Sequence, residues 1–172
     1  MKNNYLKLIK LLLIVFSIFL FLFLINKNFP RSGQITVEMK LGKDLPAITK
    51  LGPEPRVILQ NGFQSVLEGP VYFDLRSMPW FKEAIVIIVF LEEEMELEGI
   101  AGQSGPGWQY DIKEPFLVND LEQGLKIALF NFDLDELYQQ KNIRRFLISL
   151  KPSGQRERPE LKIYSLKIIL NQ

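Results

Sequence analysis

The sequence of 172 residues contains neither cysteine nor histidine. These absences exclude disulfides, thiolate nucleophiles, cysteine-ligated iron–sulfur clusters, imidazole zinc sites and the Ser-His or Cys-His pairs of many hydrolases. We therefore expect a protein that is not an enzyme and that uses no cofactor and no metal. A pair of carboxylates suited to glycoside hydrolysis stays open as an alternative, because the spacing of such a pair is set by the tertiary structure.

The sequence also lacks a strong excess of one charge, since 21 lysines and arginines face 20 aspartates and glutamates. Lys2, Lys7 and Lys10 precede an apolar N-terminal run, and all the acidic residues follow it. After residue 25 the balance is therefore 18 basic against 20 acidic residues, or −2. A nearly neutral domain shows no basic footprint, so nucleic acid is not predicted as a partner.

The sequence does contain one long apolar run near its N-terminus. Between residues 11 and 25 every residue except Ser17 is Leu, Ile, Val or Phe. Counted from Tyr5, the segment 5–25 covers about 31 Å at 1.5 Å per residue, which matches the hydrocarbon thickness of a bilayer. The run predicts a transmembrane anchor over 1–25, inserted in the lipid bilayer through residues 5–25. A cleaved signal peptide is the alternative, although the following residues lack a small-x-small cleavage pair.

The basic residues before the apolar run predict the orientation of this anchor. Lys2, Lys7 and Lys10 favour an N-terminus that stays in the cytoplasm, because basic flanks are retained on that side. The predicted location is the cell membrane, single-pass, with an extracytoplasmic C-terminal domain. Residues 26–34, which include Pro30 and Gly33, are predicted to form a juxtamembrane tether.

The remaining residues, 35–172, are predicted to form one mostly β domain. Alternating or apolar runs separated by Gly-Pro and Asn-Gly breakers predict strands over 35–41, 57–60, 64–67, 71–76, 84–91, 95–100, 108–112, 125–130, 144–150 and 161–170. Many short strands at this spacing are typical of an antiparallel β-sandwich.

Three local features of this domain carry further predictions. The run 84–91 is apolar on both faces, which predicts a central strand. The apolar phase of the last run changes near Tyr164 and Ser165, which predicts a bulge there. A helix of about two turns is expected over 134–141, capped by Asp133 or Asp135.

Several motifs follow one another in an order that resembles a known group of folds. A Pro-Val-Tyr-Phe-Asp-Leu strand is followed by a Pro-Trp-Phe turn, a long apolar strand and a Gly-Pro-Gly-Trp-x-Tyr loop, and the chain closes with Arg-Phe-Leu-Ile-Ser-Leu and Leu-Lys-Ile-Tyr-Ser-Leu-Lys-Ile. Over roughly residues 33–172 the chain resembles the galactose-binding-like jelly-roll β-sandwich, as found in uncharacterised bacterial single-pass membrane-anchored proteins. The resemblance implies a jelly-roll-like fold. Many members of that group bind sugars and some bind a structural calcium, but no ligand motif matches residue by residue.

Aromatic residues in the turn-rich segments are the candidate ligand-binding groups. Trp80, Trp108 and Tyr110 are predicted to stack on sugar rings if they are exposed. The alternative is that these residues, with Phe81, cover the ends of the sandwich core, because large aromatic side chains are usually well buried.

Clusters of charged residues admit two interpretations each. Oxygen ligands for calcium could come from Asp111, Glu114, Asn119, Asp120, Asp133, Asp135 and Glu136, but none follows a calcium-loop spacing, and turn or cap roles are favoured. Five glutamates between Glu92 and Glu98 are interpreted as gatekeepers beside the apolar strand 84–91. A basic C-terminal patch that meets anionic lipid or polymer could be formed by Lys141, Arg144, Arg145, Lys151, Arg156, Arg158, Lys162 and Lys167, against the alternative of charges on outward strand faces.

These features together predict a membrane-tethered, non-catalytic interaction module outside the cytoplasm. Its expected role is to dock a protein partner in the cell envelope. The alternative function is a carbohydrate-binding module for cell-surface glycan, which would use Trp80, Trp108 and Tyr110.

Overall fold

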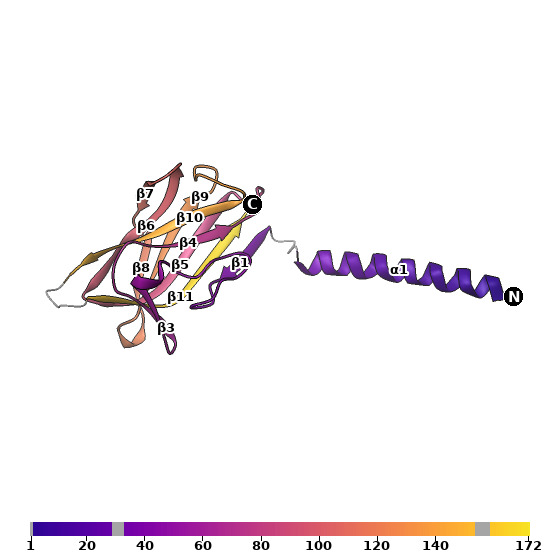
Figure 1. The fold of residues 1–172 in the computed structure, drawn as a ribbon, viewed down its shortest axis with the longest axis horizontal. Coiled ribbons are helices and arrows are strands. Elements are labelled where there is room, and N and C mark those ends of the chain that lie inside the picture. Colours follow the sequence, from indigo (N-terminus) through magenta and orange to yellow (C-terminus); the bar gives the residue numbers. More distant parts are fainter. Residues whose placement is uncertain (1, 29–32, 154–158) are drawn as a thin grey trace. The chain divides into compact units, whose positions relative to one another are not determined.

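The computed structural model describes residues 2–28, 33–153 and 159–172, and it consists of one helix, eleven strands and two short 3-10 turns. In chain order (Figure 1) the elements are α1 Lys2–Asn28, β1 Gln34–Glu38, η1 Glu54–Arg56, β2 Val57–Gln60, β3 Phe63–Val66, β4 Val71–Arg76, β5 Glu83–Glu93, β6 Met95–Gly105, β7 Gln109–Lys113, β8 Leu117–Asp120, η2 Glu122–Gly124, β9 Lys126–Asp133, β10 Ile143–Pro152 and β11 Glu160–Asn171. The chain divides into two compact units, 1–35 and 36–172.

The N-terminal unit consists mainly of α1, which ends three residues beyond the predicted anchor. Within the described residues, no helix combines the length and the apolar character that crossing a membrane requires. The prediction that the helix over 1–25 spans a membrane is therefore wrong. That prediction counted a segment containing Lys7 and Lys10, whereas the run free of charge, 11–25, covers only about 22 Å of a hydrocarbon layer about 30 Å thick. In the predicted tether, residues 26–28 belong to α1 and residues 29–32 lie outside the described residues.

The second unit is an antiparallel sandwich of two β-sheets, as the sequence predicts. One sheet has seven strands in the order β2-β3-β11-β5-β9-β8, with β1 also paired to β11. The other has four strands in the order β4-β10-β6-β7 (Figure 1). Consecutive strands pair in β2–β3, β6–β7 and β8–β9, whereas the other neighbours, such as β3 and β11 or β4 and β10, are far apart in the sequence, so each sheet also depends on long-range pairing.

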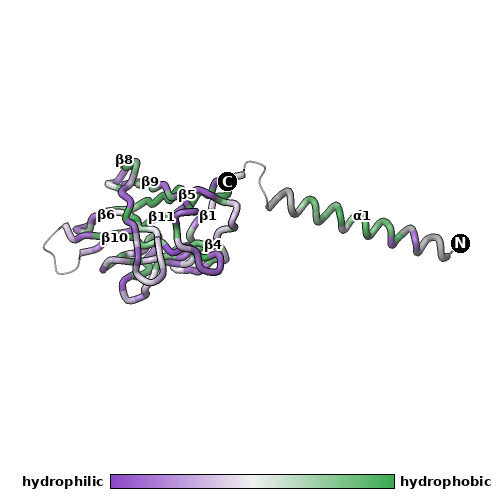
Figure 2. The backbone as a smooth tube through the Cα atoms, turned by 90° about the horizontal axis from the view of Figure 1, so that it is seen from above, coloured by the Kyte–Doolittle hydropathy of each residue, from purple (hydrophilic) through white to green (hydrophobic). Residues whose placement is uncertain are grey.

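The core lies between the two sheets and contains alternate residues of their strands. Val71, Phe73 and Leu75 of β4 are fully buried, which confirms their predicted phase. Phe146 of β10 stacks on Phe73 with ring centroids 5.3 Å apart, and it meets Phe132 of β9 edge-on at 5.0 Å. These rings link the two sheets, and such aromatic pairs stabilise a core beyond the area that they bury. Figure 2 shows the hydrophobic residues along β5, β9 and β11.

The longest predicted strands occupy the middle of the seven-stranded sheet. β5 lies between β11 and β9, so the run 84–91 is central as predicted. Only one of its faces is fully buried, because its other apolar residues are half-buried. In β11 the register shifts between Ile163 and Ser165, which confirms the predicted bulge. The bulge keeps Leu161 and Leu166 on the same buried face although their phases in the sequence are opposite.

Two segments differ from the sequence expectations. The predicted helix over 134–141 is wrong, since the chain there forms bends and a tight turn before β10. Leu134 is instead fully buried, and the Oδ1 atom of Asp133 accepts a hydrogen bond from the N–H of Asp135 at 2.8 Å, which stabilises a turn. The short strand β8 has no counterpart among the predicted strands. It lies at the edge of its sheet, and its residues are exposed on both faces.

Candidate functional site

Four polar side chains lie in one row across the outer face of the four-stranded sheet. Asp74 of β4 is opposite Arg145 of β10, and Gln103 of β6 is opposite Tyr110 of β7. Because Phe146 is opposite Gly102, the antiparallel register places Arg145 next to Gln103. The neighbours Phe73 and Phe146 point into the core, so the four side chains of the row point outward.

A bidentate ion pair forms the β4 end of the row. Arg145 Nε donates to Asp74 Oδ1 at 2.7 Å, and Arg145 Nη2 donates to Asp74 Oδ2 at 2.9 Å. The same guanidinium lies over the ring of Tyr72, with its central carbon 4.7 Å from the ring centroid. The hydrogen bonds to Asp74 raise the pKa of Arg145 above its ordinary value. The carboxylate and the guanidinium are therefore held in fixed orientations on the sheet face.

Tyr110 and Trp108 form the aromatic end of this row. Their ring centroids lie 6.0 Å apart, and 81% of the surface of Trp108 is exposed. Burial raises the pKa of Tyr110, while the nearby Arg145 partly opposes that shift. A cavity of about 500 Å³ opens beside the two rings, and it is lined by Asp74, Gln103, Gly107, Trp108, Tyr110, Gln140, Lys141, Ile143 and Arg145. Its volume falls within the range of about 300–1,000 Å³ that is typical of ligand sites.

Gln103 shapes the turn that carries Trp108. Its Nε2 atom donates to the carbonyl oxygens of Gly105 and Gly107, both at 2.9 Å. Gly107 has a φ of 79°, a conformation that side-chain-bearing residues rarely adopt. The β6–β7 turn is therefore fixed from within, so Trp108 projects from an ordered turn.

A second cavity, of about 530 Å³, adjoins the first at the β9–β10 turn. It is lined by Pro46, Ala47, Arg76, Ser77, Met78, Lys141, Asn142 and Ile143. Lys141 and Ile143 line both cavities, so the two depressions meet at this turn. Arg76 is opposite Ile143 in the register of β4 and β10, which places the second cavity next to the polar row.

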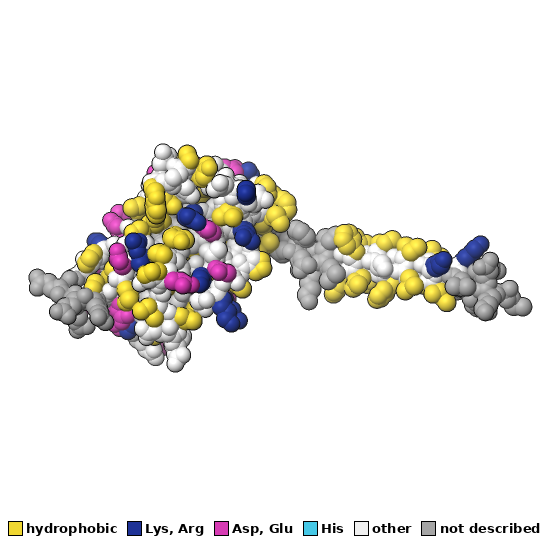
Figure 3. Space-filling model, in the orientation of Figure 1, with side chains coloured by type: hydrophobic (Ala, Val, Ile, Leu, Met, Phe, Trp, Pro, Cys, Tyr) yellow, Lys and Arg dark blue, Asp and Glu magenta, His cyan; other side chains and the backbone are white. Residues whose placement is uncertain are grey.

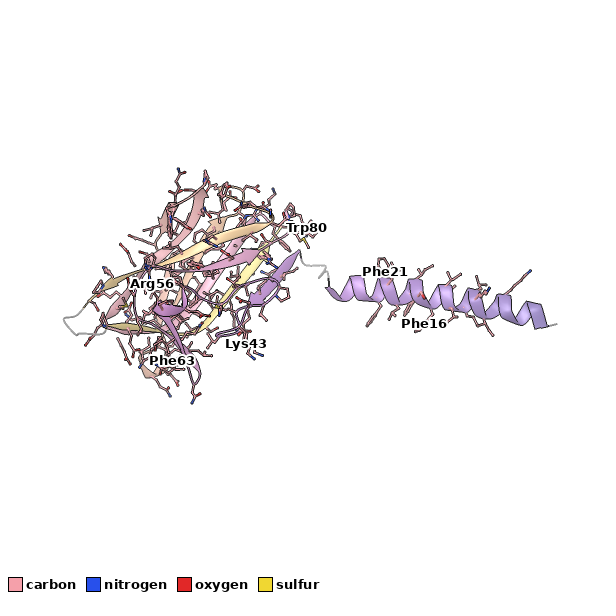
Figure 4. All side chains as sticks on the ribbon, viewed as in Figure 1. Phe16, Phe21, Lys43, Arg56, Phe63 and Trp80 are labelled. Atoms are coloured by element: carbon pink, nitrogen blue, oxygen red, sulfur yellow. The ribbon has the colours of Figure 1, made fainter. Side chains whose placement is uncertain are left out.

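The third predicted aromatic, Trp80, lies apart from the other two. It belongs to the β4–β5 connection (Figure 4), it lines neither cavity, and 43% of its surface is exposed. Its ring is 6.2 Å from that of Phe81, which is buried. The structure thus brings Trp108 and Tyr110 together and leaves Trp80 elsewhere. The alternative drawn from the sequence is that the aromatic residues cover the core. This holds for Phe81, which is buried, but not for Trp108, which is exposed.

Sequence reasoning did not single out Asp74 or Gln103, and it named Lys141 and Arg145 only as members of a basic patch. The signal available in the sequence was the outward phase of the predicted strand 71–76, which contains Asp74. Strand phase alone does not show which outward residues of different strands are neighbours, because the strand order and the register are set by tertiary pairing.

The charged clusters predicted from the sequence are dispersed in the fold. Within the described ranges, no group of three or more acidic residues is placed to hold a metal ion. Asp135 pairs with Lys82, and Glu136 lies 3.9 Å from Lys113. The glutamates of β5 and β6 also have partners, since Glu92 pairs with Lys126. Glu93 pairs with Lys162 and Glu96 with Lys151, and Figure 3 shows charges of both signs side by side on the domain.

The predicted basic patch is divided in the same way. Arg144 is buried in the core, whereas Arg145 binds Asp74. Three lysines of the set lie beside acidic partners, namely Lys151 beside Glu96, Lys162 beside Glu93 and Lys167 beside Glu38. Arg156 and Arg158 lie outside the described residues. Lys141 is the member that lines the two cavities.

Comparison with known proteins identifies the fold. No protein-family model and no curated protein matches the chain. A solved structure described as a "xylan-binding module CBM15" is similar with a TM-score of 0.50 at 12% sequence identity, covering 81% of this chain and 99% of that one. At this identity the likeness shows a shared β-sandwich fold.

A second solved structure gives a weaker match. It is that of a carbohydrate-binding module with specific mannan recognition, TmCBM27, and it matches with a TM-score of 0.40 at 11% identity, covering 80% of this chain and 99% of that one. The first match and the two-sheet topology together describe the domain as a jelly-roll-like β-sandwich, structurally similar to one carbohydrate-binding module.

Proposed function

We propose that the domain binds a polysaccharide on the outer face of its four-stranded sheet. The observation that carries this proposal is the exposure of Trp108 beside Tyr110, at the mouth of the cavity of about 500 Å³. An indole exposed to water over 81% of its surface contributes little to the core. Its flat apolar face is suited to stacking on the apolar face of a sugar ring. Binding of a sugar therefore explains why this residue is exposed.

The polar row supplies the hydrogen bonds that such a ligand requires. Sugar hydroxyls donate and accept hydrogen bonds, and the row offers both the Asp74 carboxylate and the Arg145 guanidinium. Their mutual hydrogen bonds fix both groups before a ligand arrives, which lowers the entropic cost of binding. The similar fold of a xylan-binding module supports the proposal. Asp74 is the one acidic residue among the described residues that line this cavity, and it is bound by Arg145, so the site lacks the pair of carboxylates that glycoside hydrolysis uses and we assign it a binding role.

An array of plant and bacterial polysaccharides, probed with the full chain, tests the proposal. We expect at least one polysaccharide to bind, and Trp108→Ala to weaken that binding about tenfold, since stacking on one aromatic ring contributes about 1–1.5 kcal/mol. Trp80→Ala is the matched control, because it removes an equally large exposed ring that lines neither cavity. Binding that is equally strong in wild type and Trp108→Ala contradicts the proposed site, and binding to no polysaccharide contradicts the function.

Docking of a cell-envelope protein is the second candidate function, and one observation favours it. The edge strand β8 and its flanks expose apolar side chains, namely Phe116, Leu117, Val118 and Leu121. Exposed edge strands pair readily with a strand of another chain. Crosslinking in intact cells should recover a partner with wild type and lose it with Val118→Lys. Recovery that is unaffected by this substitution counts against docking at β8. Both functions place the domain outside the cytoplasm, as the sequence predicts.

A further inference from the structure

The two adjoining cavities carry a surplus of positive charge. Their charged lining residues are Asp74, Arg76, Lys141 and Arg145, which are one acid and three bases. Asp74 is bound by Arg145, so those two charges offset each other. Arg76 and Lys141 are both exposed, and among the described residues no ion pair is recorded for either. Two positive charges therefore line the groove without an acidic partner in the described part of the chain.

The fold places Arg76, at the end of β4, and Lys141, in the turn before β10, in the lining of the same cavity. Lys141 and Asn142 form the tip of a two-residue turn, with φ angles of 51° and 64°. The turn is closed by backbone hydrogen bonds in both directions between Gln140 and Ile143, at 3.0 and 2.9 Å. Arg76 is opposite Ile143 on β4. The strand pairing and the closed turn thus fix the backbone of both residues around the second cavity, which meets the first at Lys141 and Ile143.

We propose that this groove selects polysaccharides that carry carboxylates, namely glycans containing uronic acid residues. The inference rests on the proposed function and deepens it. Trp108 and Tyr110 would stack on a sugar ring in the first cavity, and a carboxylate further along the glycan would meet Arg76 and Lys141. A guanidinium matches the planar, two-oxygen geometry of a carboxylate, and the lysine adds a mobile point charge.

Isothermal titration calorimetry with three polymers tests this inference on the full chain. The first is polygalacturonate, the second is the same polymer with its carboxylates methyl-esterified, and the third is dextran sulfate of similar charge density. We expect polygalacturonate to bind about tenfold more tightly than the neutral ester, with a preference that weakens as salt is raised. Arg76→Gln and Lys141→Gln should each reduce the preference about threefold, the gain expected of an exposed charge pair. Lys43→Gln is the matched control, because Lys43 (Figure 4) is exposed and lines neither cavity.

The outcomes separate this inference from the proposed function. If wild type binds polygalacturonate and its ester with equal affinity, and Trp108→Ala binds neither, the carboxylate preference is overturned. The proposed binding of a polysaccharide at the aromatic site then remains supported. The carboxylate preference is also overturned if dextran sulfate binds as tightly as polygalacturonate, because the groove would then bind polyanions in general. A preference that survives Arg76→Gln combined with Lys141→Gln also overturns it. If neither form of the polymer binds, both the inference and the binding of this polymer at the aromatic site fail.

Discussion

Arg145 and Asp74 face each other on β10 and β4 and are joined by two parallel hydrogen bonds of 2.7 and 2.9 Å. The preceding residue, Arg144, points to the opposite side of the sheet and is buried. Its Nε donates to the carbonyl oxygen of Leu134 at 3.0 Å, and its Nη1 donates to Ser77 Oγ at 2.6 Å. The two consecutive arginines thus have different roles. Arg145 lies on the candidate binding face, and Arg144 is buried inside the fold.

The Asp74–Arg145 pair should stabilise the domain only modestly. Arg145 is partly exposed, and ion pairs in contact with water contribute about 1 kcal/mol or less. We expect a coupling energy of about 1 kcal/mol in a double-mutant cycle of Asp74→Ala and Arg145→Ala, measured by urea unfolding. Additive effects of the two substitutions would contradict this prediction, because they would show no energetic coupling between the two side chains.

Arg144 should contribute far more to stability than Arg145. Arg144→Ala leaves a cavity and removes the hydrogen bonds that hold the β4–β5 connection and the bend at Leu134, so we expect a loss of about 3 kcal/mol or more. Arg144→Met fills most of the volume and buries no charge, so it should cost less. Chemical denaturation of both variants checks this order. A loss from Arg144→Met that equals the loss from Arg144→Ala would assign the effect to the hydrogen bonds alone.

Gly99 should be the glycine of β6 that tolerates a side chain least. A Cβ at Gly99 would lie 2.6 Å from the carbonyl oxygen of Lys113, whereas a Cβ at Gly102 would meet only the end of the Leu137 side chain. A backbone carbonyl in a paired strand cannot move aside without breaking the pairing, so Gly99→Ala should destabilise by about 1–3 kcal/mol. Thermal unfolding measures this, with the exposed Ser104→Ala on the same strand as control, expected within about 0.5 kcal/mol of wild type. Equal stability of the two variants contradicts the prediction.

Tyr110 should make the stability of the domain fall at alkaline pH. Its pKa is raised in the fold, chiefly by burial, so the folded state holds the phenolic proton more tightly than the unfolded state. The stabilisation is complete below the unfolded pKa of about 10 and is lost as pH rises through the folded value. The difference in unfolding free energy between wild type and Tyr110→Phe, measured from pH 8 upward, should therefore shrink above about pH 10. A constant difference across that range would refute this linkage.

The lysines at the N-terminus, which precede the apolar run, predict that the domain lies outside the cytoplasm. A reporter that is active only outside the cytoplasm, fused after Gln172, should give signal. Deletion of residues 1–33 should abolish that signal, because the deletion removes the apolar run with its lysines. Activity of a cytoplasm-only reporter at the same position would show that the predicted location is wrong.

Much of the sandwich could be predicted from the sequence, because strand phase is a local property. Alternation in 71–76 identifies Val71, Phe73 and Leu75 as core residues, and the phase change in 161–170 indicates the bulge in β11. The turn containing Gly105, Pro106 and Gly107 likewise marks Trp108 as a residue beside a turn. The helix expected over 134–141 failed because tertiary contacts override a short local pattern. Leu134 is drawn into the core, and its carbonyl oxygen accepts a hydrogen bond from Arg144.

The sequence by itself therefore determined which residues face inward, which types of chemistry are absent and where an exposed aromatic could be expected. Only the tertiary structure decided that Asp74, Arg145, Gln103 and Tyr110 form one row, and that Arg76 and Lys141 line one cavity beside it. The physical reason is that side chains repeat every two residues along a strand. Sliding two strands past each other by two residues keeps every side chain on its face but changes all of its cross-strand neighbours, so periodicity fixes the face and only long-range pairing fixes the site.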